Sequence, residues 1–277
     1  MITTIPLEDT FGDITRKASS GKQVGASQLA SMAGIAAPRL EKLLNDAERP
    51  TPAEARAVAE TLHLDPGKLT DSGLQQWYPQ PFKAPSFLQH QINAPYPSNG
   101  YFLILKEAGI AAFVDPAGSP APIIETLRRS KVALTYILLT HKHRDHSDAL
   151  GAVRKAFPDA QPVIHELDAK EVGSAAHGAI PIRDGGRLPF GDASIEMLHT
   201  PGHTDGSSCF IYKGMIFTGD ELFAGSIGRD FGERFHYSDQ LAAIRQKILS
   251  LPGETVVLPG HGPASTVAQE QAHNPFF

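Results

Sequence analysis

The sequence predicts a mixed α/β fold, in which a layered domain of strands and helices follows a small all-α domain. After about residue 99, short apolar strand patterns alternate with helical patterns, whereas the first eighty residues show helical patterns alone. Between the two parts, residues 77–99 contain five prolines and no clear periodicity, which is typical of a linker. We therefore expect a helical domain over 1–80, a proline-rich linker over 81–98 and an α/β domain over 99–277.

Length and composition exclude several classes of protein. A chain of 277 residues can bury a substantial core, and no apolar run approaches the roughly 18 residues of a membrane helix. The N-terminus lacks the basic and apolar segments of a secretion signal, so we expect a cytoplasmic protein. The net charge of −5 gives no general attraction to nucleic acid or anionic membranes. The single cysteine, Cys209, excludes an internal disulfide, and its apolar neighbours predict that it packs in the core.

Three helices are predicted in the first part. Residues 27–34 form an amphipathic segment that ends at Gly34, and residues 38–45 repeat leucine at helical spacing. Thr51-Pro-Ala-Glu54 combines a capping threonine, a proline at the first helical position and a capping-box acid. It begins a third helix, over 55–62, which ends before the Asp-Pro-Gly turn at 65–67.

The second part predicts strands and helices in alternation. Strands are expected over 101–106, 109–115, 132–140, 162–165, 193–199, 208–212, 215–218 and 255–258. Helices are expected over 122–129, 147–157 and 239–249. The first two strands are separated by a short turn, as are those at 208–212 and 215–218, so each pair predicts a hairpin.

The most informative segment is His141-Lys-His-Arg-Asp-His146, which follows the apolar strand pattern of residues 132–140. Its three imidazoles and one carboxylate suit a divalent transition metal such as zinc. Three further candidates, His203, Asp220 and His261, lie in turns that contain Gly or Pro and follow apolar runs. Such turns direct polar side chains towards one edge of a sheet, so we expect a catalytic metal site there.

The remaining histidines carry no comparable spacing argument. His165 lies in a short strand pattern, and His199 precedes the turn that contains His203. We expect both to pack in the fold or to support the ligands, and not to bind metal themselves.

A series of motifs resembles the metallo-β-lactamase superfamily and, within it, the glyoxalase II-like hydrolases of the short bacterial type. The motifs are Asp115-Pro116, Thr140–His146, His199–His203, Gly219-Asp220, Gly228-Arg229, Pro259–Pro263 and the ending Glu270–Phe276. The resemblance spans residues 99–277 and implies an αββα sandwich with metals at one edge of its two sheets.

The resemblance also implies a division of the ligands between two divalent metal ions. His141, His143 and His203 would hold the first metal, whereas Asp145, His146 and His261 would hold the second. Asp220 would bridge both. Zinc is the metal expected first, with iron or manganese as alternatives, and the pair would activate a water molecule and polarise a carbonyl. Asp145 has a second oxygen with which it could orient the nucleophile or carry its proton, so it is the catalytic candidate.

The substrate that this resemblance favours is a thioester such as hydroxyacylglutathione. Arg229 resembles the basic residue that helps to bind the glutathione carboxylate in the longer glyoxalase II enzymes. Asp230 and Phe231 depart from the pattern of those enzymes, and the basic residues of their C-terminal domain have no counterpart. A second hypothesis is a persulfide dioxygenase, which resembles this chain but uses one iron held by residues equivalent to His141, His203 and Asp220.

The N-terminal helices resemble the helix-turn-helix of Cro/C1-type repressors over residues 28–69. A third hypothesis is therefore a DNA-binding regulator whose metal domain senses a metabolite. The helix that would enter the major groove begins Ala36-Ala-Pro-Arg39, which offers few groups for base recognition. Residues 1–80 carry ten acids against eight bases, a poor match to phosphate. We therefore expect no nucleic-acid or membrane partner, but a small-molecule substrate and a helical module that serves homodimer formation or covers the active site.

Overall fold

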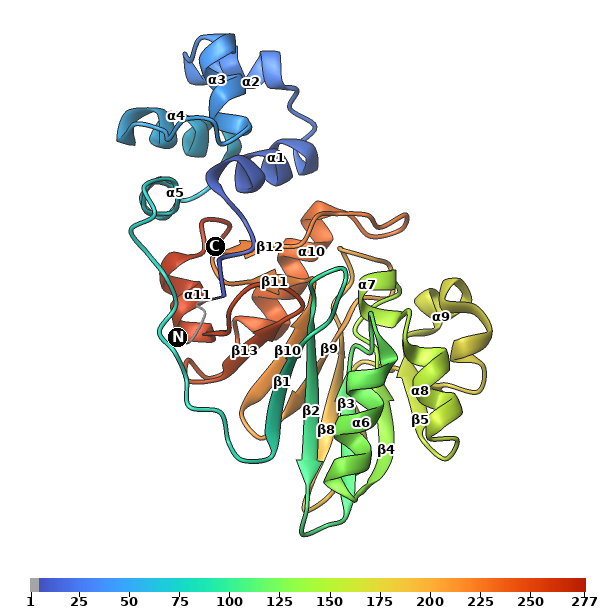
Figure 1. The fold of residues 1–277 in the computed structure, drawn as a ribbon. Helices are drawn as coiled ribbons and strands as arrows, with labels where there is room; N and C mark the ends of the chain where they lie inside the picture. The colour runs from blue at the N-terminus through green and yellow to red at the C-terminus, as the bar shows by residue number, and fades with distance from the viewer. Residues whose placement is uncertain (1–4) are drawn as a thin grey trace.

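The computed structural model describes residues 5–277 and shows a helical part above a two-sheet part (Figure 1). The helical part contains α1 (Phe11–Gly21), α2 (Ala26–Ala33), α3 (Ala37–Leu44), α4 (Pro52–Leu62) and α5 (Pro66–Gly73). The helices predicted over 27–34, 38–45 and 55–62 are confirmed, with small differences at their ends. Helices α1 and α5 lie outside the three predicted ranges.

Capping residues explain where these helices begin and end. The Thr51 hydroxyl accepts a hydrogen bond from the Glu54 backbone N–H, and the Glu54 carboxylate accepts one from the Thr51 N–H, so the predicted capping box is confirmed. Thr10 and Asp13 form a second capping box at the start of α1. Gly34 ends α2 in the left-handed region, at φ +65°, which a residue without Cβ adopts at little cost.

Residues 74–87, here called the strap, run from α5 along one side of the two-sheet part without regular secondary structure (Figure 1). After the strap comes β1 (Leu88–Ile92), which pairs antiparallel with β2 (Asn99–Leu105). The segment expected as a proline-rich linker over 81–98 therefore contains one strand of the first sheet, β1. Prolines flank this strand on both sides, and its apolar pattern is too short to stand out without its partner strand.

The first sheet has six strands in the order β1-β2-β3-β4-β5-β6. Besides β1 and β2, these are β3 (Ile110–Val114), β4 (Ala133–Leu138), β5 (Gln161–Ile164) and β6 (Ile180–Pro181). Strands β3 to β6 are parallel to one another. The connecting helical segments are α6 (Pro120–Ser130), α7 (Arg144–Ser147), α8 (Leu150–Ala156), α9 (Glu166–Val172) and the 3₁₀ helix η1 (Gly173–Ala176).

The second sheet has the order β14-β13-β10-β9-β8-β7. Its strands are β7 (Gly186–Phe190), β8 (Ala193–His199), β9 (Ser208–Tyr212), β10 (Met215–Gly219), β13 (Val256–Pro259) and β14 (Ser265–Thr266). A short hairpin follows β10 and comprises β11 (Leu222–Phe223) and β12 (Ser226–Ile227). The helical segments are α10 (Tyr237–Ala243), its π-helical continuation η2 (Ile244–Ile248) and α11 (Val267–His273).

Three apolar clusters hold these layers together. One lies between the sheets and contains Leu103 from the first sheet and Phe210 from the second. Another lies between the first sheet and its helices, where Phe113 and Ile123 are fully buried. The third contains Ile216 of the second sheet and Ile244 of η2. Helices thus cover the outer face of each sheet, and the predicted αββα sandwich behind a helical region is confirmed.

The helical part shares the third apolar cluster with the two-sheet part. Ile14 of α1 and Leu69 of α5 belong to the same buried cluster as Phe276 near the C-terminus. Polar contacts reinforce this junction, since Lys17 Nζ donates to the Ile227 carbonyl at 2.7 Å and the Asp65 N–H donates to the Pro275 carbonyl at 2.8 Å. The helical part therefore packs directly against the two-sheet part.

No helix among residues 5–277 is both long enough and apolar enough to cross a membrane.

Candidate metal centre

The seven predicted ligands lie in four regions that follow the carboxyl ends of strands in both sheets, and the region after β4 includes the short helix α7. All four regions meet at the end of the sandwich where α7 lies (Figure 1). His141, His143, Asp145 and His146 follow β4, His203 follows β8, Asp220 follows β10 and His261 follows β13. Strands that are far apart in the sequence thus deliver these side chains to one place.

The first cluster consists of His141, His143 and His203, one nitrogen of each lying within 4.8 Å of the others. Nδ1 of His143 and Nε2 of His203 are 2.9 Å apart. Nε2 of His141 is buried and has no hydrogen-bond partner among the described residues. A buried polar atom without a partner is costly, so this arrangement suits a bound cation.

In His203 and His146, the hydrogen bond made by Nδ1 shows that Nε2 carries no proton and can bind a metal. Nδ1 of His203 lies 2.7 Å from the Arg229 carbonyl oxygen, which can only accept, so Nδ1 carries the proton. Nδ1 of His146 lies 3.0 Å from a carboxylate oxygen of Asp115 and donates to it in the same way. Both rings therefore direct the lone pair of Nε2 towards the centre of the site.

The second cluster consists of Asp145, His146 and His261. Nε2 of His261 lies 3.2 Å from Nε2 of His146 and 3.3 Å from Oδ2 of Asp145. Two imidazole nitrogens that lack a proton repel each other at this distance unless a cation or a proton lies between them. This cluster also suits a metal ion.

Asp220 faces both clusters. Its Oδ1 lies 3.3 Å from Nε2 of His146, and its Oδ2 lies 3.5 Å from Nε2 of His203 and 3.6 Å from Nε2 of His261. The position is the one that the resemblance implied for a bridging ligand.

The electrostatics of the site favour positive charge. Burial alone would raise the pKa of Asp220, but the charges of His146 and His261 hold it well below its usual range. Burial lowers the pKa of His203 to about 4, so its imidazole is neutral and can act as a ligand. In the second cluster, Asp220 raises the pKa values of His146 and His261 although burial lowers them, so these rings lie in a negative potential that attracts a proton or a metal ion.

Comparison with known proteins agrees with this geometry. A sequence profile described as the metallo-beta-lactamase superfamily matches residues 94–261, more than half of the chain. The chain belongs to the metallo-beta-lactamase superfamily.

Two relatives and one solved structure are each more than 30% identical to this superfamily member in sequence. The probable metallo-hydrolase YqgX of Bacillus subtilis is 35% identical, over 66% of this chain and 93% of its own length. The hydroxyacylglutathione hydrolase GloC of Haemophilus influenzae is 34% identical, over 63% of this chain and 91% of its own length. The crystal structure of TTHA1623 in a di-iron-bound form is 32% identical with a TM-score of 0.58, and the match covers 68% of this chain and all of that one.

Glycines bring the backbone of this superfamily member close to its ligands. A Cβ at Gly260 would lie 2.3 Å from Oδ1 of Asp220 and 2.7 Å from Cε1 of His146. A Cβ at Gly228 would lie 1.7 Å from the Asp220 carbonyl oxygen. Either side chain would displace Asp220, so the Pro-Gly-His and Gly-Arg motifs need glycine for close packing.

Two buried carboxylates support the ligands, and the sequence assigned neither a role. Asp115 accepts hydrogen bonds from the Thr140 N–H and hydroxyl, each at 2.8 Å, and also holds His146. Glu221 accepts from the His203 N–H at 3.0 Å, and burial raises its pKa to about 8. The sequence showed Asp115 only as part of an Asp-Pro motif and Glu221 only as the neighbour of Asp220, and the folded chain shows which ligand each one supports.

A third supporting carboxylate comes from the segment that precedes α1. Oε2 of Glu8 lies 3.9 Å from Nδ1 of His261, the ring nitrogen that points away from the cluster. The Glu8 backbone N lies 3.1 Å from the position of a Cβ on Gly262, so the two segments are in close contact. No sequence signal links residue 8 to residue 261, because the contact depends on how the helical part packs.

The predicted substrate residue Arg229 lies at the rim of the site. Its side chain is exposed, and its guanidinium carbon lies 5.8 Å from the centre of the Phe231 ring. Phe231 is exposed as well and packs edge-on against His143 and His203, at 5.5 and 5.6 Å between ring centres. An arginine and an aromatic ring therefore lie beside the first cluster.

The residues expected to pack in the fold do so. His165 and His199 stack on each other at 4.0 Å between ring centres, and neither belongs to a cluster of potential metal ligands among residues 5–277. His165 also caps α9 by accepting from the Leu167 N–H. Cys209 is fully buried, and burial raises the pKa of its thiol, as expected for a core residue without nucleophilic chemistry.

Proposed function

We propose that this protein is a binuclear metal-dependent hydrolase that cleaves a thioester such as a hydroxyacylglutathione. The observation that carries the proposal is the pair of three-residue clusters that face one shared carboxylate, Asp220. A relative named as a hydroxyacylglutathione hydrolase supports the substrate class.

The donor set fits two divalent metal ions. His141, His143 and His203 would hold one, Asp145, His146 and His261 the other, and Asp220 both. The buried nitrogen of His141 and the buried Oδ1 of Asp220 have no hydrogen-bond partner among the described residues, as expected of ligand atoms. Nitrogen and carboxylate donors suit zinc, and the di-iron form of a similar structure supports iron as the alternative. When bound, such a pair supplies an activated water nucleophile and polarises the carbonyl that is attacked.

Asp145 is placed to act on a proton during the reaction. Its Oδ2 lies 3.3 Å from Nε2 of His261, and the side chain is one third exposed. The other carboxylate oxygen is therefore available to a water molecule or to the substrate, and can orient the attacking group or carry its proton. The Ser98 hydroxyl donates to the Asp145 carbonyl and fixes the backbone at this residue.

Arg229 and Phe231 would bind the part of the substrate that is remote from the reacting bond. The exposed guanidinium of Arg229 can pair with a carboxylate of the substrate that is remote from the reacting bond. Phe231 lies between Arg229 and the first cluster and offers an apolar surface to the linking chain. Together they favour an elongated anionic thioester.

The decisive experiment measures metal content and two activities on the same preparation. We expect about two metal ions per chain and hydrolysis of S-lactoylglutathione without oxygen uptake. His203→Ala and Asp220→Ala should each abolish turnover and lower the metal content, whereas the control His165→Ala should keep both. Full metal content and normal activity in the first two variants would refute the site assignment.

A mononuclear iron persulfide dioxygenase is the second candidate. His203 and Asp220 lie 3.5 Å apart beside His141, so the three residues that such an enzyme needs are present. One iron per chain, together with oxygen uptake on glutathione persulfide, would replace the hydrolase proposal with this one.

A further inference from the structure

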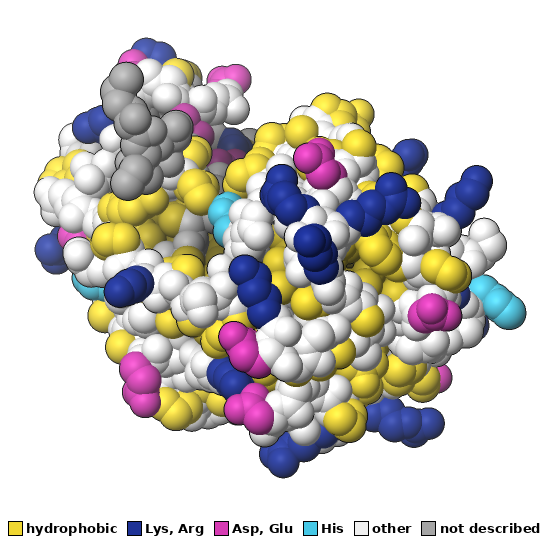
Figure 2. All heavy atoms as spheres, turned by 60° about the horizontal axis from the view of Figure 1, so that its bottom comes forward, with side chains coloured by type: hydrophobic (Ala, Val, Ile, Leu, Met, Phe, Trp, Pro, Cys, Tyr) yellow, Lys and Arg dark blue, Asp and Glu magenta, His cyan; other side chains and the backbone are white. Residues whose placement is uncertain are grey.

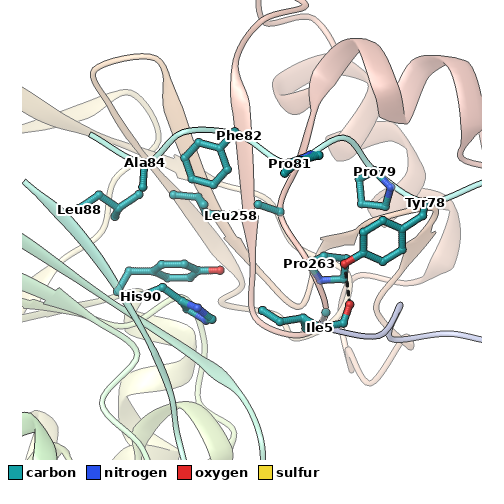
Figure 3. Close-up of a pocket in the computed structure, with 13 residues that line it drawn as sticks. Ile5, Tyr78, Pro79, Pro81, Phe82, Ala84, Leu88, His90, Leu258 and Pro263 are labelled. Carbon is teal, nitrogen blue, oxygen red and sulfur yellow. Dashed lines mark hydrogen bonds between the residues drawn. The ribbon is translucent and has the colours of Figure 1, made fainter. Parts of the chain in front are cut away.

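The strap leaves a cavity behind the loop that carries His261. It has a volume of about 520 Å³ and lies between the strap, the edge strand β1 and the loop after β13 (Figure 3). The metal ligands do not line it. Figure 2 looks onto this side of the molecule, and hydrophobic side chains line the hollow on its left.

The walls of this cavity are almost entirely apolar. Pro79, Pro81 and Phe82 of the strap line one side, and Leu88, Leu258 and Pro263 complete the apolar lining (Figure 3). No charged side chain of the described residues lines it. Two tyrosine hydroxyls are already engaged, since Tyr78 donates to the Ile5 carbonyl at 2.7 Å and Tyr101 donates to the Pro259 carbonyl at 2.8 Å.

The cavity persists because the strap cannot collapse into it. Prolines at 79, 81 and 85 restrict its backbone, and Gln80 holds it in place through a hydrogen bond from its N–H to Gln269 at 3.1 Å. An apolar hollow of several hundred Å³ with few polar groups at its rim is typical of a ligand site.

We propose that this cavity, the strap pocket, binds the hydrocarbon part of a small amphiphile. The absence of charge among its described lining residues favours an alkyl or acyl chain, whose polar end would remain near the exposed His90 at the rim. The family profile begins at residue 94, whereas most of the wall comes from residues before it. Residues that precede the matched segment therefore form the larger part of the site, and residues 101, 258 and 262–264 complete it.

The strap pocket is connected to the metal centre by hydrogen bonds. Nε2 of His90 lies 2.8 Å from Oδ1 of Asn99, whose amide donates at 2.9 Å to the carbonyls of Pro259 and Gly262. These two residues flank the loop that carries His261. A chain seated in the pocket would contact this loop directly and shift the affinity of the second metal site. This link rests on the proposed function, whereas ligand binding does not.

The test is calorimetric titration of the full-length protein with 1-hexanol, 1-heptanol and 1-octanol. We expect one saturable site whose affinity rises about fourfold with each added methylene, as burial of hydrocarbon requires. Ala84→Trp and Ala264→Phe, which add bulk to the lining, should each weaken octanol binding about tenfold or more. The matched control Ala47→Trp changes an exposed alanine outside the pocket and should bind as the unmodified protein does.

Circular dichroism shows whether each variant is folded. Three results would overturn the site: no saturable binding, an affinity that does not depend on the chain length of the alcohol, or unchanged octanol binding in both Ala84→Trp and Ala264→Phe when these variants are folded. Zinc affinity, measured by competition with a chromophoric chelator, should change at least about threefold in saturating octanol. An unchanged zinc affinity would overturn the link to His261, and loss of thioester hydrolysis alone would bear only on the proposed function.

Discussion

Arg229 is exposed at the rim of the metal centre, so its removal should affect substrate binding and not the reacting bond. A group that grips a remote carboxylate binds the ground state and the transition state alike, so its loss affects binding more than chemistry. For Arg229→Ala we expect KM for S-lactoylglutathione to rise about two- to fivefold, the range for a solvent-exposed ion pair, with a smaller change in kcat. Steady-state kinetics measure this, and unchanged kinetics would remove Arg229 from the substrate site.

Glu8 supports His261 from outside the cluster, so it should affect metal affinity without being a ligand. An exposed ion-pair contact at 3.9 Å contributes less than a hydrogen-bonded supporting partner, up to about 1 kcal/mol. Glu8→Gln should therefore weaken zinc binding at the proposed second site about two- to fivefold in a chelator competition. Glu60→Gln, an exposed acid on α4, is the control. Equal zinc affinities in the two variants would show that Glu8 plays no such part.

Glu270 should make stability depend on pH. It is fully buried and accepts from the Gly225 N–H at 3.0 Å and the Asn274 amide at 2.9 Å, and burial raises its pKa to about 7. Between the unfolded pKa of 4.5 and this value, the folded state keeps a proton that the unfolded state has released. The protonated Glu270 therefore contributes fully to the free energy of unfolding below pH 4.5. This contribution falls by about 3 kcal/mol as the pH rises from 4.5 through 7.

Glu270→Gln keeps the shape and removes the titration. Urea unfolding between pH 4.5 and 8 should show a smaller loss of stability with rising pH in this variant than in the unmodified chain. Parallel curves for the two proteins would mean that Glu270 is ionised in the fold.

The loop after β13 illustrates how an element controls the site. Gly260 lies against both Asp220 and His146, so Gly260→Ala must displace one of them. We expect the second cluster to lose metal affinity and the proposed thioester hydrolysis to fall about tenfold or more, with helix content unchanged by circular dichroism. Gly25→Ala, which would meet nothing within 4 Å, is the control. Normal metal content in Gly260→Ala would show that the loop is free to adjust.

The helical elements also bear on DNA binding. Arg39 near the start of α3 is held by both carboxylate oxygens of Glu54, at 2.8 Å each, and by Glu48. The rest of the first turn is Ala-Pro, so the side chain best suited to a base edge is already engaged. The helix-turn-helix therefore stays a prediction from the sequence, and these contacts do not favour base recognition by α3.

At the scale of the whole molecule, the shared apolar cluster makes the helical part an integral part of the fold. We expect no sequence-specific DNA binding by the full-length protein when duplexes that it selects from a random library are compared with unselected duplexes by fluorescence anisotropy at low salt. Any residual binding should be weak and independent of sequence, since the chain carries a net charge of −5. A sequence-specific shift that weakens steeply with salt would instead promote the regulator hypothesis.

The sequence by itself determined the layered α/β class, the third-helix cap at Thr51 and the candidate ligands, because these depend on local patterns. Periodicity, capping residues and the dense His-Lys-His-Arg-Asp-His segment are all short-range signals. Strand β1 was not predicted, because a five-residue edge strand between prolines is stabilised by its partner β2 and has no clear sequence pattern of its own.

Only the tertiary structure decided which groups meet across the chain. The support of His146 by Asp115, the approach of Glu8 to His261 and the cavity beneath the strap all join segments that lie tens to hundreds of residues apart. Such contacts result from packing a whole apolar surface, to which each residue contributes a small part. No local pattern encodes them, so they become visible only when the layers and the helical part are assembled.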